Sequence, residues 1–230
     1  MKHYAIIVAG GTGSRMGADI PKQFLSYGNK PIIIHTLQKF INSKLGIEIV
    51  LVVHADFTVY TQNLVNQHFT NSQQQSIQIT EGGETRFHSV KNGLDLLSPT
   101  DNDLVAVHDS VRSLLSIDLI NHCYNITAEK GNAIPAVAVT NSIRTFTDIE
   151  QNESKALDRS QLRSVQTPQC FKLATLKDAY NTNFKESFTD SASVAEHSGI
   201  KINLIEGEAN NIKITRPIDL KLAELLSEVW

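Results

Sequence analysis

The chain has 230 residues, of which 41% are hydrophobic, and a formal net charge of −3, so it can bury the core of a large α/β domain. This charge balance lacks the basic patch of nucleic-acid-binding proteins, and no apolar run approaches the roughly 18 residues of a membrane span. Because the N-terminus also lacks a signal-peptide cleavage region, we expect a cytoplasmic protein in which Cys123 and Cys170 stay reduced, with no nucleic-acid or membrane partner.

The first predicted element is a buried strand over residues 5–9, which leads into a glycine-rich loop. The loop reads AGGTGSRMG, contains Arg15, and is followed by Lys22 in the stretch PKQF. Glycines let backbone N–H groups approach a phosphate chain closely, and fixed cations stabilise charge that develops during a reaction. The stretch therefore predicts a triphosphate site with cations suited to nucleotidyl transfer.

Two other glycine loops and a plain structural turn are the alternatives. A Walker A loop requires Gly-Lys, which does not occur in the chain. The dinucleotide fingerprint G-x-G-x-x-G almost fits from Gly11, but its third glycine falls on Met16. Asp56 could serve as the acidic residue of that fingerprint, so dinucleotide binding and a structural turn remain open at this point.

Strand and helix patterns then alternate along the chain. Apolar runs predict further strands over residues 47–53, 77–80, 105–107, 133–139 and 202–205. Helical spacing predicts helices over residues 31–40, 57–69, 90–97, 119–128, 173–184, 191–197 and 218–229. This order predicts a Rossmann-like, mostly parallel twisted sheet flanked by helices on both faces. Ligands bind at the carboxyl ends of such strands, so the glycine loop, Gly82-Gly83 and Asp109 should converge there.

Residues 140–167 interrupt the alternation. The segment is polar and has no helical period, and charged residues are dense between Asp148 and Arg159. It fits either a solvated surface hairpin or an arm that reaches toward another subunit. We expect one nucleotidyltransferase domain over residues 1–230 with an arm insertion at about 140–167.

Several stretches resemble one enzyme family. AGGTGSRMG followed by PKQF is similar to the signature of the sugar-phosphate nucleotidyltransferases, and more narrowly to cytidylyltransferases acting on 2-C-methyl-D-erythritol 4-phosphate or ribitol 5-phosphate. GGETRFHS, HDSVR, DRSQLRSVQTPQ and NIKITRP follow in the family's order, so the resemblance runs from residue 5 to about 224. The family's common HDAAR reads HDSVR here, a version that also resembles the ribitol-phosphate enzymes.

The resemblance implies a role for individual residues. Arg15, Lys22 and Lys213 would be catalytic cations. The nucleotide would contact Ala9, Gly10, Gly11, Thr12, Gly13, Gly83, Glu84, Arg86, Ser89 and Ser110. The acceptor would contact Asp109, Ser142, Arg159, Thr167 and Asp190. Mg²⁺ or another divalent cation would be the cofactor, with Asp109 the one possible protein ligand, and a homodimer would form through the arm.

Four of these residues also have a plainer interpretation. Asp109 could simply pair with Arg112, and Asp190 could cap a helix. Lys213 could be a solvated lysine and Arg159 an exposed arginine on the arm. The sequence offers no histidine pairing at metal or triad spacing and no G-x-S-x-G, so hydrolase chemistry has no support.

The resemblance implies transfer of a cytidylyl group from CTP to 2-C-methyl-D-erythritol 4-phosphate in the non-mevalonate isoprenoid pathway, with release of pyrophosphate. The acceptor phosphate would attack the α-phosphorus in line, so that catalysis consists of positioning and charge neutralisation. Ribitol 5-phosphate is the alternative acceptor. A dinucleotide-binding oxidoreductase and a non-catalytic nucleotide-binding regulator are the alternatives from other classes.

Overall fold

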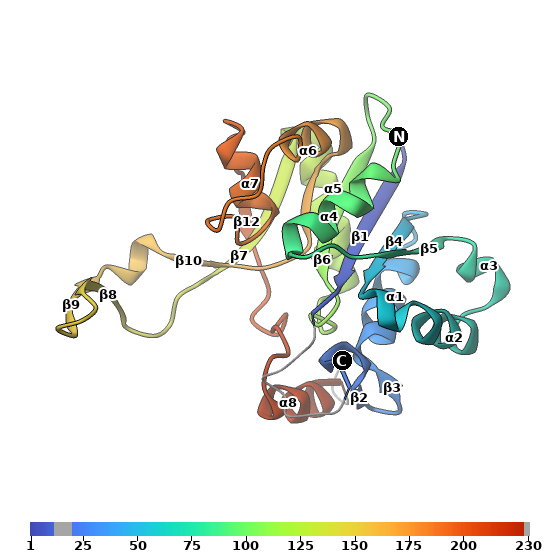
Figure 1. Cartoon of the computed structure of the whole chain (residues 1–230), viewed down its shortest axis with the longest axis horizontal. Helices are drawn as coiled ribbons and strands as arrows, with labels where there is room; N and C mark the ends of the chain where they lie inside the picture. The colour runs from blue at the N-terminus through green and yellow to red at the C-terminus, as the bar shows by residue number, and fades with distance from the viewer. Residues whose placement is uncertain (12–19, 228–230) are drawn as a thin grey trace.

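The computed structural model describes residues 1–11 and 20–227, and its centre is a twisted eight-stranded sheet (Figure 1). Seven strands follow the order β10-β7-β11-β6-β1-β4-β5, and the eighth, β12, pairs with β7. Their bounds are β1 His3–Ala9, β4 Glu48–Val53, β5 Ile77–Glu81, β6 Leu104–Asp109, β7 Asn132–Ala138, β10 Arg163–Val165, β11 Gln169–Lys172 and β12 Leu204–Glu206. Strands β5, β4, β1 and β6 run parallel, which confirms the predicted Rossmann-like sheet.

Helices cover both faces of this sheet because successive residues of a strand point to opposite sides. On one face, Ala5 and Ile7 of β1 pack with α1, α2 and α5. On the other, Tyr4 and Ile6 pack with α4, α6 and α7. The helices are α1 Ile32–Asn42, α2 Thr58–His68, α3 Asn71–Gln74, α4 Arg86–Asp95, α5 Ile117–Lys130, α6 Leu173–Ala179, α7 Ser191–His197 and α8 Pro217–Ser227. Short 3-10 turns are η2 Lys22–Phe24, η3 Ala55–Phe57 and η4 Arg159–Gln161.

The strand order reverses direction at β1. After β1 the chain adds β4 and β5 on one side and then crosses to add β6 on the other. A sheet of this kind forms a crevice outside the carboxyl end of the strand at the reversal. The glycine loop begins at that end of β1.

Some element bounds differ from the sequence-based predictions. The helix predicted over residues 90–97 begins at Arg86, where the Thr85 side chain caps it by accepting from the His88 N–H. The helix predicted over 173–184 ends at Ala179. Strand β11 was not predicted, since its four residues carry no long apolar run, yet it lies antiparallel between β6 and β7.

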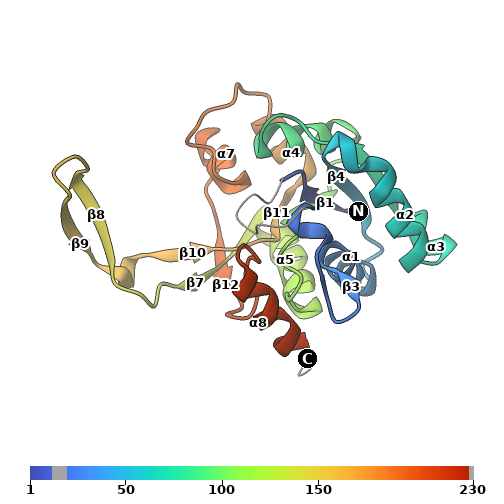
Figure 2. The same cartoon turned by 60° about the horizontal axis from the view of Figure 1, so that its bottom comes forward.

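The segment predicted as a hairpin or a protruding β-arm does contain a β-hairpin. Strands β8 (Ile143–Asp148) and β9 (Glu153–Leu157) pair as a two-stranded hairpin that stands away from the main sheet in both views (Figures 1 and 2). After the hairpin, β10 returns the chain to the main sheet and pairs with β7. The segment therefore leaves and re-enters the sheet beside β7.

Helix α8 lies below the sheet, against the small β2–β3 hairpin formed by Ser26–Tyr27 and Lys30–Pro31. A separate cluster of apolar side chains joins them, in which Ala223 of α8 packs with Tyr27, Val111 and Ile214. Among the described helices, none is both long and apolar enough to cross a lipid bilayer.

Candidate functional site

A cavity of about 250 Å³ lies at the carboxyl ends of β1, β5 and β6, where the strand order reverses. It gathers residues from five separate parts of the sequence, namely 8–11, 22–23, 83–89, 109–111 and 213. Of the residues predicted to act in the site, its lining includes Ala9, Gly10, Gly11, Lys22, Gly83, Glu84, Arg86, Ser89, Asp109, Ser110 and Lys213. The predicted convergence is thus observed for Gly10 and Gly11 at the start of the glycine loop, for Gly83 and for Asp109.

The start of the glycine loop is held by a residue that the sequence reasoning did not single out. Gln23 is buried, and its Nε2 donates to the Ala9 carbonyl at 2.6 Å and to the Gly11 carbonyl at 3.1 Å. These bonds fix the backbone where the strand becomes a loop. The signal was a neutral polar residue between Lys22 and Phe24, in the stretch PKQF that directly follows the glycine loop. Thr12, Gly13 and Arg15 lie outside the described residues.

The loop between β5 and α4 forms a second wall of the cavity with its backbone. The Gly83 N–H donates to Ser89 Oγ at 3.2 Å, which folds the loop over the first turn of α4. A Cβ at Gly83 would lie 2.4 Å from the Cβ of His88, so only glycine fits this close approach. The wall therefore offers a flat backbone surface with a hydroxyl beside it.

Asp109 lies at the centre of a cluster of opposite charges. Arg86 donates to its Oδ1 from Nη2 at 3.1 Å and from Nε at 3.2 Å. Lys213 Nζ lies 2.8 Å from its Oδ2, and Arg112 Nε lies 3.8 Å from the same oxygen. Pairing with Arg112, the plainer expectation, is therefore only the loosest of three contacts.

The electrostatics follow from this arrangement. Burial opposes ionisation of Asp109, but the nearby charges of Arg86, Lys213 and Arg112 hold the pKa of its carboxyl well below the usual range. Burial likewise opposes the charge of Arg86, and the Asp109 carboxylate raises the pKa of that guanidinium. Three basic side chains thus share one carboxylate.

The backbone of Asp109 is held by a chain of hydrogen bonds through Thr167 and His108. Its backbone N–H donates to Thr167 Oγ1 at 3.1 Å, and the Thr167 hydroxyl lies 2.9 Å from Nδ1 of His108. Burial lowers the pKa of His108 to about 3, so the ring is neutral. Its Nε2 lies 3.1 Å from the Arg112 carbonyl, which can only accept, so Nε2 carries the proton and Nδ1 accepts from Thr167. Thr167 therefore positions Asp109 rather than lining the cavity.

Besides Thr167, three further predicted acceptor residues lie outside the cavity lining. Ser142 and Arg159 are exposed on the arm, and Arg159 donates to the Thr140 carbonyl of its own segment. Asp190 caps α7, accepting from the Ser193 N–H at 2.8 Å, and its other oxygen accepts from Gln169 Nε2 at 2.7 Å. The geometry thus agrees with the plainer interpretation of Asp190 as a helix cap.

Among its described residues, the cavity offers few protein ligands to a divalent cation. Within residues 1–11 and 20–227, no three His, Cys, Asp or Glu side chains lie close enough to form a metal site. Asp109 still offers carboxylate oxygens, the donors that Mg²⁺ prefers, at the wall of the cavity. The residues therefore fit a cation that is held mainly by a bound triphosphate, with one carboxylate from the protein.

Comparisons with known proteins agree on one family. A sequence model of the 2-C-methyl-D-erythritol 4-phosphate cytidylyltransferase family matches residues 3–228. Cytidylyltransferases of this name from Bacteroides thetaiotaomicron and Porphyromonas gingivalis are 42% and 43% identical over 226 residues, covering 98% of this chain and 100% and 97% of theirs.

Solved structures give the same result. The Francisella tularensis 2-C-methyl-D-erythritol 4-phosphate cytidylyltransferase superposes with a TM-score of 0.80 at 32% identity, covering 98% of this chain and 100% of its own. The 4-diphosphocytidyl-2C-methyl-D-erythritol synthase from Anaerococcus prevotii has a TM-score of 0.81 at 26% identity, covering 99% and 96%.

Proposed function

The chain belongs to the 2-C-methyl-D-erythritol 4-phosphate cytidylyltransferase family, and we propose that the cavity beside β1 is where it binds CTP. The protein is a nucleotidyltransferase of isoprenoid biosynthesis. It transfers a cytidylyl group from CTP to 2-C-methyl-D-erythritol 4-phosphate, which gives 4-diphosphocytidyl-2-C-methyl-D-erythritol and pyrophosphate. Between the two acceptors that the sequence left open, the family decides for methylerythritol phosphate.

The observation that carries the site assignment is the position of Lys213 beside Asp109 and the glycine loop. We infer that the backbone of Gly10 and Gly11 cradles the triphosphate, with Lys22 beside it. Lys213 is the cation that would reach the α-phosphate, and Arg15, outside the described residues, would be a further one. The cytosine would lie against the backbone of Gly83, with Ser89 beside it.

The chemistry requires no protein nucleophile. An oxygen of the acceptor phosphate is already anionic and attacks the α-phosphorus of CTP, while the bond to the bridging oxygen of pyrophosphate breaks in line. Negative charge increases around the α-phosphorus and on the leaving group. Cations already held at the cavity wall stabilise that charge without reorganising at the moment of reaction.

Asp109 keeps these cations in place before the nucleotide binds. Its contacts with Arg86, Arg112 and Lys213 offset the repulsion between three neighbouring positive charges. A nucleotide phosphate would compete with Asp109 for Lys213, whose side chain lines the cavity and is 41% exposed. Asp109 would then be free to accept from the hydroxyls of the polyol or to hold a divalent cation.

We infer that Mg²⁺ accompanies the nucleotide. Asp109 would hold it together with phosphate oxygens, and the ion would keep mostly water as its other ligands. When bound, Mg²⁺ neutralises part of the triphosphate charge. The described residues contribute separately, by aligning the α-phosphorus and by holding Lys213 beside it.

The arm would complete the site from a second copy of the chain. Its hairpin exposes Phe146 (57%) and Ile149 (79%), and an isolated two-stranded hairpin is only marginally stable in water. We propose that the arms of a homodimer each reach the partner's cavity, where Arg159 would bind the acceptor phosphate with its planar guanidinium, next to Ser142. Neither residue lines the cavity of its own subunit, and the hairpin of the arm stands away from the main sheet (Figures 1 and 2).

We also propose that the protein works in the cytoplasm. Cys123 and Cys170 are both buried as free thiols. Reduced cysteines of this kind are usual in a reducing compartment.

A steady-state assay tests the proposed function. With CTP and Mg²⁺, pyrophosphate release should be far faster with 2-C-methyl-D-erythritol 4-phosphate than with ribitol 5-phosphate. Equal or reversed rates would contradict the acceptor assignment. In the same buffer CTP with Mg²⁺ should raise the melting temperature while NADP should not, which separates this function from dinucleotide binding.

A further inference from the structure

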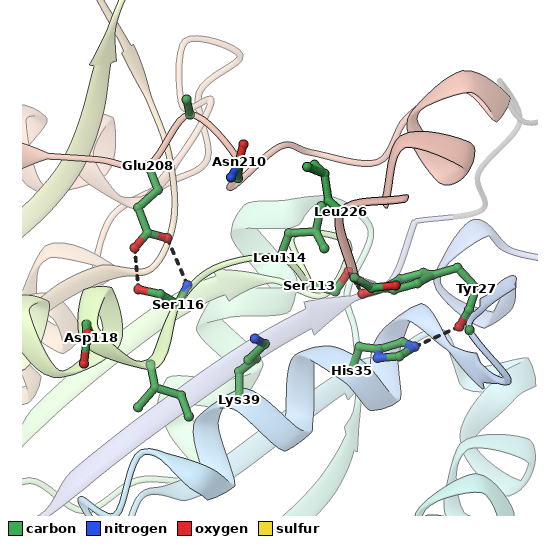
Figure 3. A pocket seen from close by; sticks show the side chains of 14 residues that line it. Tyr27, His35, Lys39, Ser113, Leu114, Ser116, Asp118, Glu208, Asn210 and Leu226 are labelled. Carbon is green, nitrogen blue, oxygen red and sulfur yellow. Dashed lines mark hydrogen bonds between the residues drawn. The ribbon is translucent and has the colours of Figure 1, made fainter. Parts of the chain in front are cut away.

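A second and larger cavity, of about 820 Å³, lies beside α1 and the end of α8 (Figure 3). It is bounded by α1, the β2–β3 turn, residues 113–118, residues 208–210 and the end of α8. Its lining shares no residue with that of the nucleotide cavity. The volume lies within the range usual for small-molecule sites.

One part of the lining is apolar and flat. Leu114, Ile117 and Leu226 contribute aliphatic side chains. Tyr27 and His35 stack with ring centroids 4.0 Å apart and an interplanar angle of 9°. His35 Nε2 lies 2.9 Å from the Tyr27 carbonyl, which holds this pair in place. A planar apolar body could pack against these surfaces.

Lys39 supplies the positive charge of this cavity. Figure 3 shows its side chain rising from α1 into the space between Ser116 and Leu114. Within the described part of the chain, it has no hydrogen bond or ion pair. Burial lowers the pKa of the neighbouring His35, so this ring adds no second charge at neutral pH.

The two carboxylates of the lining, Glu208 and Asp118, both lie at the N-terminus of α5 and not beside Lys39 as ion-pair partners. Glu208 accepts from the Ser116 N–H at 2.9 Å and from the Ser116 hydroxyl, and both groups belong to the N-cap residue of α5. Asp118 is exposed at the rim, in the first turn of the same helix. The positive end of the helix dipole favours both charges there. Lys39 is thus available to an anion that enters the cavity.

We propose that this cavity is a second ligand site, for a small molecule with a flat apolar body and one anionic group. The anion binds Lys39, and the apolar body packs between Leu114, Leu226 and the stack of Tyr27 and His35.

Occupation of this site is linked to the nucleotide cavity through two shared segments, an inference that rests on the proposed function of that cavity. One segment runs from Ser110 at the nucleotide cavity to Leu114 at the second cavity, and the other from Glu208 to Lys213. They are joined where the Ile214 N–H donates to the Val111 carbonyl at 2.9 Å. A ligand that fits the second cavity stabilises the arrangement in which Lys213 pairs with Asp109, so it weakens CTP binding.

Calorimetric titration with naphthalene-1-sulfonate, in the absence of nucleotide, tests the binding site. Neutral 1-naphthalenemethanol is the matched probe. The native chain should prefer the sulfonate by about fivefold, the scale of one partly exposed ion pair. Lys39→Met should remove the preference and Lys39→Arg should retain it. Lys201→Met removes an exposed lysine that lines neither cavity, and should change nothing.

The linkage is tested by repeating the titration at saturating CTP with Mg²⁺. The affinity for the sulfonate should fall a few-fold and then stay constant as CTP is raised further. The sulfonate should lower the affinity for CTP by the same factor.

The site would be overturned if the native chain bound the two probes with equal affinity. It would also be overturned if Lys39→Met kept the native preference for the sulfonate. Strict competition between the sulfonate and CTP would show that they share one site, which would overturn the second cavity. An unchanged or raised affinity for CTP in the presence of the sulfonate would overturn the linkage. Without the sulfonate, Lys39→Met should turn over CTP at the native rate. Failure of the proposed function would therefore appear in the assay of the native chain and would not depend on this titration.

Discussion

The nucleotide cavity and the arm differ in where their charged residues find partners. Asp109 in the cavity is 8% exposed and contacts Arg86, Arg112 and Lys213, which come from three different parts of the chain. On the arm, and counting partners within residues 1–11 and 20–227 alone, Arg144 bonds only to Ser154 across the hairpin and Arg159 only to Thr140. The charged side chains of the cavity are thus paired across the subunit, and these two arginines of the hairpin are paired within the arm segment.

This difference teaches which region can act without a second copy. The cavity side chains are held by the sheet, so their geometry is set before any ligand binds. The arm buries little of its own apolar surface, and Ile149 at its tip is 79% exposed. A two-stranded hairpin of this kind gains stability when it packs on another surface. The cavity should therefore respond to mutation within one subunit, and the arm between subunits.

The largest effect is expected when the centre of the cavity cluster is neutralised. Asp109→Asn leaves the side chains of Arg86 and Arg112, which are 24% and 13% exposed, without their anion. An uncompensated buried charge costs about 3–5 kcal/mol, so the free energy of unfolding by urea should fall by about that amount. The matched change Asp148→Asn on the exposed arm should cost less than about 0.5 kcal/mol. Similar losses in both variants would contradict the contrast between the regions.

The stabilities of the native chain and of Asp109→Asn should depend differently on pH. Because the folded-state pKa of Asp109 is depressed, its stabilisation is present above the unfolded pKa of about 4 and is lost as the pH falls further. The stability difference between native and Asp109→Asn chains should thus be full at pH 6 and shrink below about pH 4. A difference that stays constant down to pH 3 would show that it does not arise from this carboxylate's charge.

Removal of Lys213 should affect catalysis more than stability. Lys213→Ala leaves Asp109 paired with Arg86 and Arg112, so the fold should survive. Loss of one preorganised contact to transition-state charge lowers turnover by a factor on the order of 10² to 10³. A variant with normal turnover and only a raised KM for CTP would show that Lys213 contributes uniform binding instead.

The same division explains what the sequence could predict. Buried strands and glycine at their ends are local signals, so the sheet and the convergence at β1 were predictable. The partners of Asp109 were not, because Arg86 and Lys213 are far from it in sequence, and only the assembled sheet brings them closer than Arg112. Strand β11 escaped because antiparallel insertion between β6 and β7 depends on the whole sheet.

Mixing of variants tests whether the arm acts between subunits. Lys213→Ala and Arg159→Ala should each be nearly inactive alone. In a mixed dimer one site carries both lesions and the other neither, so random exchange should restore about a quarter of native activity. Mixing Lys213→Ala with Arg86→Ala is the control, because both lie in the cavity of one subunit and every site keeps a lesion. No recovery in the first mixture, despite verified exchange, would place Arg159 in its own subunit's site or outside the chemistry.

The smallest effect is expected at Asp190, where the helix-cap and acceptor-binding interpretations differ. Loss of an N-cap costs about 1 kcal/mol, so Asp190→Ala should lower the free energy of unfolding by about that amount and leave the KM for the acceptor unchanged. Asn caps a helix as well as Asp does, but its amide cannot accept from Gln169 Nε2 while its oxygen accepts from the Ser193 N–H. Stability measured by urea unfolding should therefore fall in the order native, Asp190→Asn, Asp190→Ala. If either variant instead raises the KM for 2-C-methyl-D-erythritol 4-phosphate at unchanged stability, Asp190 contacts the acceptor and the cap is incidental.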